Sequence, residues 1–174
     1  MKKFQMKKTA FFLVTLFLVS CKTYTPFEQK ASDTSKINIV LDNWHKAAAT
    51  VNFDSYFNLM TDDAIFIGTD PTENWNKEAF KAFSKPYFDK GKAWNFTSVE
   101  RNIYLSPDFK TAWFDELLDT QMKICRGSGV MKKENGEWKI AHYVLSMTIP
   151  NDNVEEVTKL KSAFDDTILS KLKK

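Results

Sequence analysis

The side chains best suited to chemistry lie on the segment from Arg126 to His142 and on the segment just before it. Asp115 and His142 are a carboxylate and an imidazole, the groups that general acid–base catalysis near neutral pH most often uses. Asp115 can orient or charge the imidazole, while Arg126 can bind a carboxylate or stabilise an oxyanion. We therefore take Asp115 and His142 as catalytic candidates and Arg126 as a ligand-binding candidate.

A predicted hairpin carries two of these candidate residues, Arg126 and His142. Asn135-Gly136 favours a tight turn, because both residue types tolerate the positive φ that hairpin turns require. A three-residue loop would place Ser128 opposite His142 and keep Arg126 on the same face. A two-residue loop would instead place Gly129 opposite His142 and turn Arg126 away. The choice matters because a slip of one residue moves every side chain to the other face of the sheet.

The preceding turn extends this face to a third strand. With a two-residue turn at Thr120-Gln121, Asp115 opposes Arg126 and Trp113 opposes Ser128. The predicted site is then a polar cluster within an apolar wall. Its members are Trp113, Asp115, Arg126, Ser128, Ile140 and His142. The alternative is that Asp115 and Arg126 simply pair, while the histidine satisfies its nitrogens within the core.

Other polar side chains are expected to have mainly structural roles. Tyr56 is kept as a ligand-binding candidate because its hydroxyl, like that of Tyr87, can point into a cavity. His45 is expected at a helix surface or half-buried, and Asp70 and Glu73 in turn-forming or capping roles. The sequence has no Gly-rich phosphate loop and no nucleophile-elbow motif, and its two histidines are far apart. We therefore expect neither a metal nor a cofactor.

Helices come first along the chain and strands follow, which is typical of an α+β fold. Apolar residues at helical spacing predict four helices, at 36–51 after a cap at 33–35, at 53–60, at 77–89 and at 152–172. Strands are expected at 64–67, 94–105, 110–119, 122–133 and 137–149.

The first twenty residues have the features of an export signal. Residues 1–8 hold four lysines and no acid, and the apolar run 10–19 is too short to span a bilayer, which takes about 20 residues. Leu18 to Cys21 resembles the bacterial lipobox, so we expect cleavage before Cys21 and lipid attachment to it. The predicted location is the cell envelope, anchored to the membrane and facing the periplasm. The expected divisions are a signal peptide at 1–20, a tether at 21–35, one domain at 36–150 and an amphipathic helix at 151–174.

Removal of this leader changes the charge of the chain. The full sequence has 25 basic and 22 acidic residues, and the loss of four leader lysines leaves 21 against 22, a net charge of −1. The basic character therefore gives no reason to expect a nucleic-acid partner. If Cys21 is acylated, Cys125 is the only other cysteine, so no disulfide can form within the chain.

Several separated motifs resemble one known family in the expected order. These are Phe66–Pro71 with Glu73 and Trp75, Ala112–Glu116, and the hairpin. Together they resemble a SnoaL-like domain of the nuclear-transport-factor-2-like superfamily over residues 36–150. The resemblance implies a cone-shaped, curved antiparallel sheet packed on N-terminal helices, with a pocket, and it favours the three-residue hairpin loop. It also implies a possible homodimer formed across the sheet.

Two functions are compatible with this resemblance. The first is a lipid-anchored envelope protein whose pocket binds a small apolar or amphipathic ligand, with Trp113, Arg126, Ser128, Tyr56 and Ile140 as its contacts. The second is a cofactor-independent isomerase, cyclase or dehydratase, as in relatives that use a pocket carboxylate or histidine for proton transfer. The sequence offers an Asp/His pair for this chemistry, but it has no Tyr/Asp oxyanion pair that matches a steroid isomerase.

Overall fold

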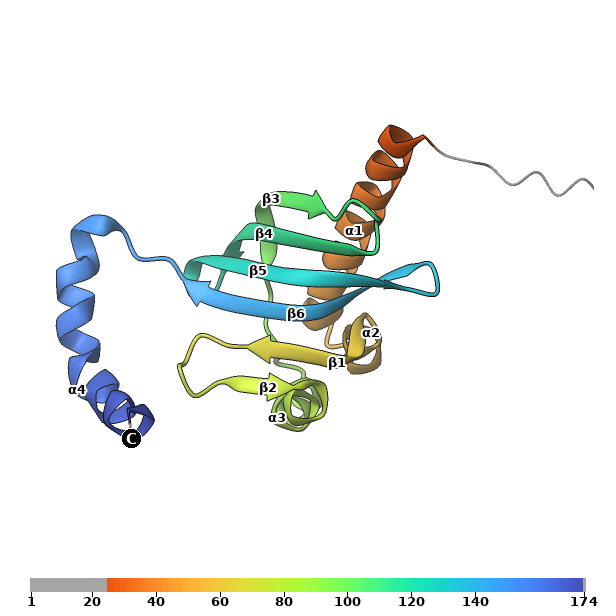
Figure 1. Cartoon of the computed structure of the whole chain (residues 1–174). Coiled ribbons are helices and arrows are strands. Elements are labelled where there is room, and N and C mark those ends of the chain that lie inside the picture. Colours follow the sequence, from red (N-terminus) through yellow and green to blue (C-terminus); the bar gives the residue numbers. More distant parts are fainter. Residues whose placement is uncertain (1–24, 174) are drawn as a thin grey trace, which may run out of the picture.

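The computed structural model describes residues 25–173 and shows a curved six-stranded sheet with helices on both sides (Figure 1). The helices are α1 (Pro26–Ala49), α2 (Phe53–Asn58), α3 (Lys77–Asp89), the short 3-10 helix η1 (Asn151–Asn153) and α4 (Val154–Leu172). The strands are β1 (Met60–Ile67), β2 (Asn74–Asn76), β3 (Thr97–Leu105), β4 (Thr111–Thr120), β5 (Lys123–Glu134) and β6 (Glu137–Met147). The expected α+β fold is confirmed.

The strands follow the order β2-β1-β6-β5-β4-β3 across the sheet. Strand β1 pairs in parallel with β6, whereas all other neighbouring strands are antiparallel. The sheet is therefore mixed, and mostly antiparallel as expected. Strand β1 also starts earlier than its apolar run, at Met60, with Asp62 and Asp63 exposed at an irregular stretch of the strand. The short edge strand β2 was not predicted, because Asn74–Asn76 has no apolar alternation.

Helix α1 starts at Pro26, within the segment predicted to be a tether. The Thr25 hydroxyl accepts a bond from the backbone N–H of Glu28, and the Glu28 carboxylate accepts one from the Thr25 N–H, which is a capping box. Asp33 is therefore not a cap. It is a buried residue of α1, whose carboxylate accepts bonds from Lys133 at 2.7 Å and from the Trp138 indole N–H at 3.1 Å.

The β5–β6 hairpin has the two-residue loop, with Glu134 opposite Glu137, so the favoured three-residue register is wrong. A second irregularity follows, because Met131 pairs with Ile140 but Val130 pairs with His142. Ala141 is thus an extra residue, a β-bulge that reverses the facing of all later β6 side chains. Ile140 consequently lies in the core, whereas His142 lies on the opposite face of the sheet.

The turn between β4 and β5 also differs by one residue from the prediction. It consists of Gln121 and Met122, since Thr120 pairs with Lys123. Asp115 therefore lies opposite Ser128, and not opposite Arg126.

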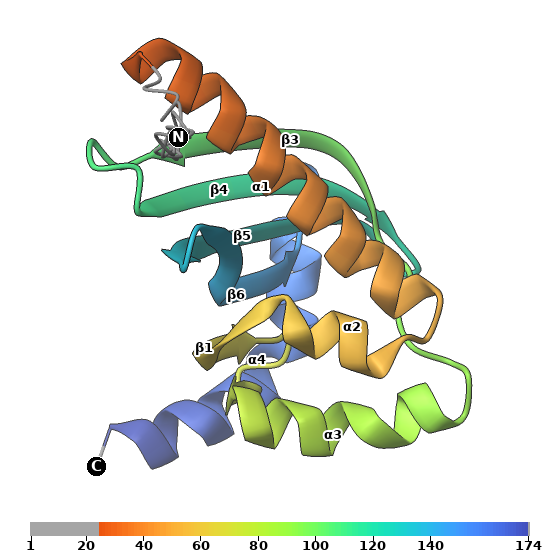
Figure 2. The same cartoon turned by 90° about the vertical axis from the view of Figure 1, so that its right-hand side faces the viewer.

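Helices α1, α2 and α3 lie on one side of the sheet, and α4 lies beyond the other side (Figure 2). The core between the first three helices and the sheet is rich in aromatic rings. Its largest fully buried members are Trp44, Tyr56, Tyr143, Phe57 and Phe80. Each ring removes a large apolar area from water, so this layer is the main source of stability.

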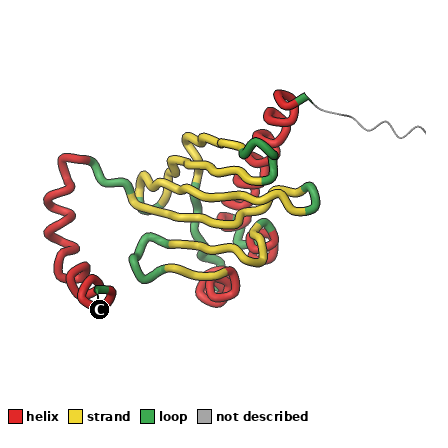
Figure 3. Tube along the Cα trace, in the orientation of Figure 1, coloured by secondary structure: helices red, strands yellow, loops and turns green. Residues whose placement is uncertain are grey.

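Helix α4 confirms the predicted C-terminal helix but packs little against the rest. The loop after β6 carries it away from the sheet (Figure 3), and none of its residues is buried. Its exposed apolar residues include Leu160, Phe164 and Leu172. No helix within residues 25–173 has the length and apolarity needed to cross a membrane.

Candidate functional site

A cavity of about 370 Å³ opens beside α3, at the ends of β1 and β6 and the start of β2. Seven aromatic side chains line its wall, namely Phe66, Trp75, Phe80, Phe83, Tyr87, Trp94 and Phe96. Its polar groups are few, namely Thr69, Glu73, Lys92 and Gln121. A mostly apolar hollow with a few polar groups is the usual form of a small-molecule site.

Helix α3 and strand β2 position these rings. Asn76 ends β2 and caps α3 by accepting a bond from the Ala79 N–H, so the strand leads directly into the helix. Trp75 stacks on Phe83 with ring centroids 4.4 Å apart, and Phe80 stacks on Phe66 at 3.9 Å. The rings hold one another in place, and the wall is therefore preformed.

The tight turn before β2 places a carboxylate in this cavity. Asp70 organises the turn by accepting bonds from the N–H and hydroxyl of Thr72, which confirms its predicted turn-forming role. Glu73 accepts a bond from the Asp70 N–H at 3.3 Å, and its backbone pairs with that of Gly68. A Cβ at position 68 would overlap the Glu73 carboxylate, so glycine leaves the room that the acid occupies.

A second group of polar residues is buried on the same side of the sheet, centred on Glu116. One carboxylate oxygen lies 2.8 Å from His45 Nε2 and accepts a bond from the Tyr143 hydroxyl at 3.0 Å. The other accepts a bond from Arg101 Nε at 2.9 Å, and the Arg101 guanidinium also binds Asp42 at 2.8 Å. Four elements, α1, β3, β4 and β6, thus meet at one charged cluster.

The charges of this cluster are balanced by its own members. Burial alone would raise the pKa of Glu116, but the hydrogen bond and charge of His45 and the Arg101 guanidinium outweigh it and hold that pKa below its usual value. Burial, together with the neighbouring Glu116 charge, raises the pKa of the Tyr143 hydroxyl, which therefore remains a donor.

The centre of this cluster is closed to solvent. Glu116 is 1% exposed and His45 is 5% exposed. Phe96 separates it from the cavity, since its ring packs edge-on against His45, with centroids 6.1 Å apart, and also lines the cavity wall. A His–Glu pair can transfer protons where substrate reaches it, but here the pair mainly joins α1 to the sheet.

Sequence reasoning missed this cluster, although one signal for it exists. Glu116 lies on the same face of β4 as Ala112, Phe114 and Leu118, all of which are buried. An acid at a buried position of a strand needs a partner, and His45 on the apolar stripe of α1 is the one the fold supplies. His45 is therefore buried and bonded, and not on a helix surface as one expectation had it.

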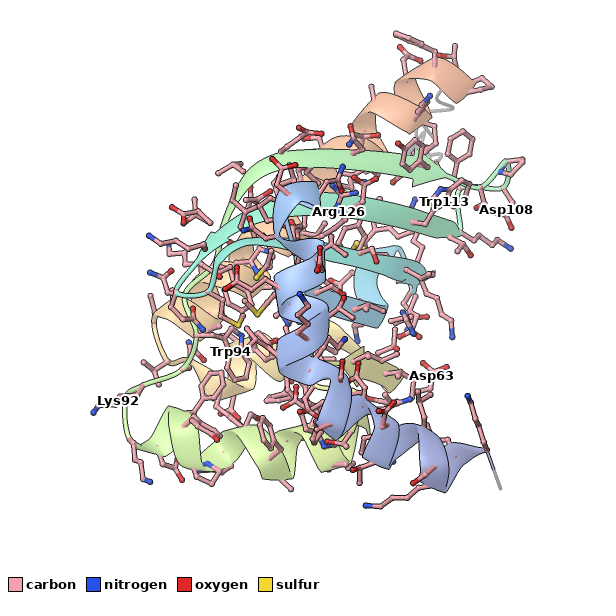
Figure 4. All side chains as sticks on the ribbon, turned by 90° about the vertical axis from the view of Figure 1, so that its left-hand side faces the viewer. Asp63, Lys92, Trp94, Asp108, Trp113 and Arg126 are labelled. Atoms are coloured by element: carbon pink, nitrogen blue, oxygen red, sulfur yellow. The ribbon has the colours of Figure 1, made fainter. Side chains whose placement is uncertain are left out.

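The predicted site residues do not line the cavity. Trp113, Asp115, Arg126 and Ser128 do share one face, as expected, and His142 shares it too. However, this is the outer face of the sheet, opposite the core, and Figure 4 shows Trp113 and Arg126 well apart from Trp94 and Lys92. The remaining two, Ile140 and Tyr56, are fully buried core residues.

On the outer face the two catalytic candidates are not joined. Asp115 accepts a bond from Asn102 at 3.2 Å, whereas His142 lies beside Val130 in the next row of the sheet. Trp113, 49% exposed, stacks on Tyr104 with centroids 5.8 Å apart. Among the residues of the described range, no three His, Cys, Asp or Glu side chains come together in a way that could hold a metal ion.

Solved structures of low sequence identity share this fold. A nuclear-transport-factor-2-like protein of unknown function from Pseudomonas putida KT2440 is 14% identical, with a TM-score of 0.58, over 71% of this chain and 92% of the other. A protein provisionally named a scytalone dehydratase, from Novosphingobium aromaticivorans, is 10% identical with a TM-score of 0.62. The match covers 71% of this chain and 89% of the other. A domain of unknown function with a cystatin-like fold from Nostoc punctiforme is 14% identical with a TM-score of 0.59, over 82% and 98%.

Sequence comparison gives the family directly. Compared with proteins of curated function, the chain has no significant match. A family description, that of the SnoaL-like domain, matches residues 37–150, which is most of the chain and nearly the whole of the predicted domain. The chain belongs to the SnoaL-like domain family.

Proposed function

We propose that the protein binds a small apolar or amphipathic ligand in the aromatic cavity beside α3. The observation that supports this most is the cavity itself, because about 370 Å³ of space is walled by seven aromatic rings. Ring stacking fixes Trp75 and Phe83 before any ligand arrives, so little ordering of side chains is needed on binding.

Mass spectrometry of the protein purified from its host tests this proposal. We expect a bound small molecule that is lost in Trp75→Ala, which removes part of the cavity wall. Trp113→Ala is the matched control, since it removes an indole from the outer face, and it should retain the ligand. Circular dichroism would verify that both variants fold. Loss of ligand in Trp113→Ala and retention in Trp75→Ala would instead support a site at Trp113, one of the ligand-binding residues that the sequence predicted.

The alternative of a proton-transfer enzyme based on Asp115 and His142 has weaker support. These residues lie in different rows of the outer face, and Asp115 bonds to Asn102 instead. Some structural neighbours carry dehydratase names, including a provisional one from Streptomyces avermitilis, but a shared fold supports many activities. The outer face is better suited to a second copy of the chain, because Tyr104 and Trp113 form an exposed apolar pair there. We propose it as a homodimer surface.

Lipid anchoring in the cell envelope, facing the periplasm, is part of the same proposal. The signal peptide, the lipobox-like segment and Cys21 lie outside the residues that the structure describes, so the support comes from the sequence. We expect Cys21→Ala to stay unprocessed by lipoprotein signal peptidase, with processing followed on a gel. Normal processing of this variant would contradict the anchor.

A further inference from the structure

The proposed binding cavity has one fixed charge within its aromatic wall. Glu73 is half-buried just before β2 and lines the same cavity as Trp75 and Trp94. Its carboxylate lies against Gly68, another residue of the cavity lining. We infer that the ligand is an amphipathic organic cation, with an alkylammonium or quaternary ammonium group beside Glu73 and an apolar body against the rings. This ligand class rests on the cavity being the binding site proposed above.

The carboxylate of Glu73 is held in position by its own turn. The Asp70 N–H donates to it, and the absence of a side chain at Gly68 lets it lie close against the backbone there. The backbone bond from the Gly68 N–H to the Glu73 carbonyl, 3.0 Å long, closes the same turn. The acid is thus preorganised at the cavity wall, which lowers the entropy cost of binding a charged group.

Glu73 has no cationic partner within the described part of the chain. The ion pairs found among residues 25–173 all involve other groups. Glu116, by comparison, has both a histidine and an arginine. A carboxylate in a hollow with low-dielectric walls attracts a cation more strongly than one on an open surface. The charge that would complement Glu73 is therefore left for a ligand to supply.

The wall of the cavity favours the same charge. The face of an aromatic ring is negative, so ammonium groups are attracted to Trp, Tyr and Phe, and Trp is the strongest of these. Two tryptophans, Trp75 and Trp94, line the cavity with Phe83 and Tyr87. Apolar rings and one carboxylate together suit a molecule with an apolar body and a cationic group, and they suit a carboxylate or phosphate poorly.

Lys92 is the one basic residue in the cavity lining, and it could attract an anion instead. It is exposed on the loop after α3 and lies at the outer edge of the molecule (Figure 4). A lysine ammonium in that setting stays hydrated and mobile, whereas Glu73 is half-buried and fixed. We therefore assign the selection of the ligand to the Glu73 carboxylate, and not to the Lys92 ammonium.

Three probes with the same phenylbutyl body test the ligand class on the full chain. They are phenylbutyl-trimethylammonium, its uncharged tert-butyl isostere, and phenylpentanoate. Binding is followed by tryptophan fluorescence, since Trp75 and Trp94 line the cavity, and by calorimetry. We expect the cation to bind about tenfold more tightly than the isostere, as a carboxylate and aromatic faces together provide.

Substitutions then identify the group responsible. Glu73→Gln keeps an oxygen for the Asp70 N–H and should remove most of the cation's advantage in affinity over the isostere, leaving the part that the aromatic faces provide. The matched control is Glu78→Gln, because Glu78 is an exposed acid on α3 that pairs with Lys81, and it should leave all three affinities unchanged.

Other outcomes separate failure of the ligand class from failure of the site. Equal binding of cation and isostere, or a preference for phenylpentanoate that disappears in Lys92→Gln, would overturn the cationic ligand while leaving the cavity as the binding site. If Trp75→Ala has no effect on the binding of any probe, both the ligand class and the site are wrong.

Discussion

Glu116 and Glu73 are two carboxylates on the helix-covered side of the sheet, and their surroundings are opposite. Glu116 is fully buried and receives bonds from His45, Arg101 and Tyr143. Glu73 is half-buried at a cavity, accepts one backbone bond, and forms no ion pair with the residues that the structure describes. A buried carboxylate with all its partners, such as Glu116, joins elements of the fold. A fixed carboxylate without an ion-pair partner at a cavity, such as Glu73, is available to bind a ligand.

The largest expected difference between the two acids is in stability. Glu116→Gln would leave His45 and Arg101 facing a neutral amide in the interior, so the free energy of unfolding should fall by about 3 kcal/mol. Glu73→Gln should change it by less than about 0.5 kcal/mol, because its surroundings are partly solvated. Urea denaturation of both variants measures this. Similar losses in the two variants would show that the sealed cluster does not stabilise the fold.

A smaller effect is expected in the pH dependence of stability. The pKa of Glu116 in the folded chain lies below the usual value of 4.5, so its stabilisation is present above about pH 4.5 and is lost as pH falls through the folded pKa. The difference in unfolding free energy between the wild type and Glu116→Gln should therefore narrow as the pH falls below about 4.5. Denaturation curves across that range measure it, and a constant difference would contradict the assigned role of Glu116.

The smallest effect is expected from removal of helix α4, which belongs neither to the Glu116 cluster nor to the Glu73 cavity. A chain ending at Pro150 should have a free energy of unfolding within about 0.5 kcal/mol of that of the full chain, because no α4 side chain is buried. It should also bind the same probes, since no α4 residue lines the cavity. Urea denaturation and the fluorescence titration together measure this. A large loss of stability would mean that α4 packs on the sheet in solution.

Local signals in the sequence were enough to predict several elements correctly. Helix α3 has the predicted bounds, Lys77 to Asp89, because Asn76 is a good cap and the apolar residues recur at helical spacing. The start of α1 could also have been predicted, since Thr25 and Glu28 have the spacing of a capping box. That signal was overlooked because the surrounding residues lack apolar periodicity.

The site was harder to predict because it depends on contacts between distant segments. The bulge at Ala141 reverses the facing of His142, and nothing in the local pattern of β6 specifies where an extra residue is inserted. The cavity residues are spread over several elements, from Phe66 to Leu145. The sequence motif that includes Glu73 and Trp75 was recognised as part of the family resemblance. The cavity itself forms only when α3 packs against β1 and β2 and brings the distant aromatic rings together.

The position of β6 in the sheet has a consequence for how the protein folds during synthesis. Within residues 25–173, β6 is the last strand to be made, yet it lies between β1 and β5. Strand β1 and the helices before it therefore leave the ribosome without the neighbour that joins them to β3, β4 and β5. Chains are made far more slowly than hairpins form, so the β3–β5 meander can form while β1 still waits for its partner. Completion of the sheet therefore has to wait until β6 has left the ribosome.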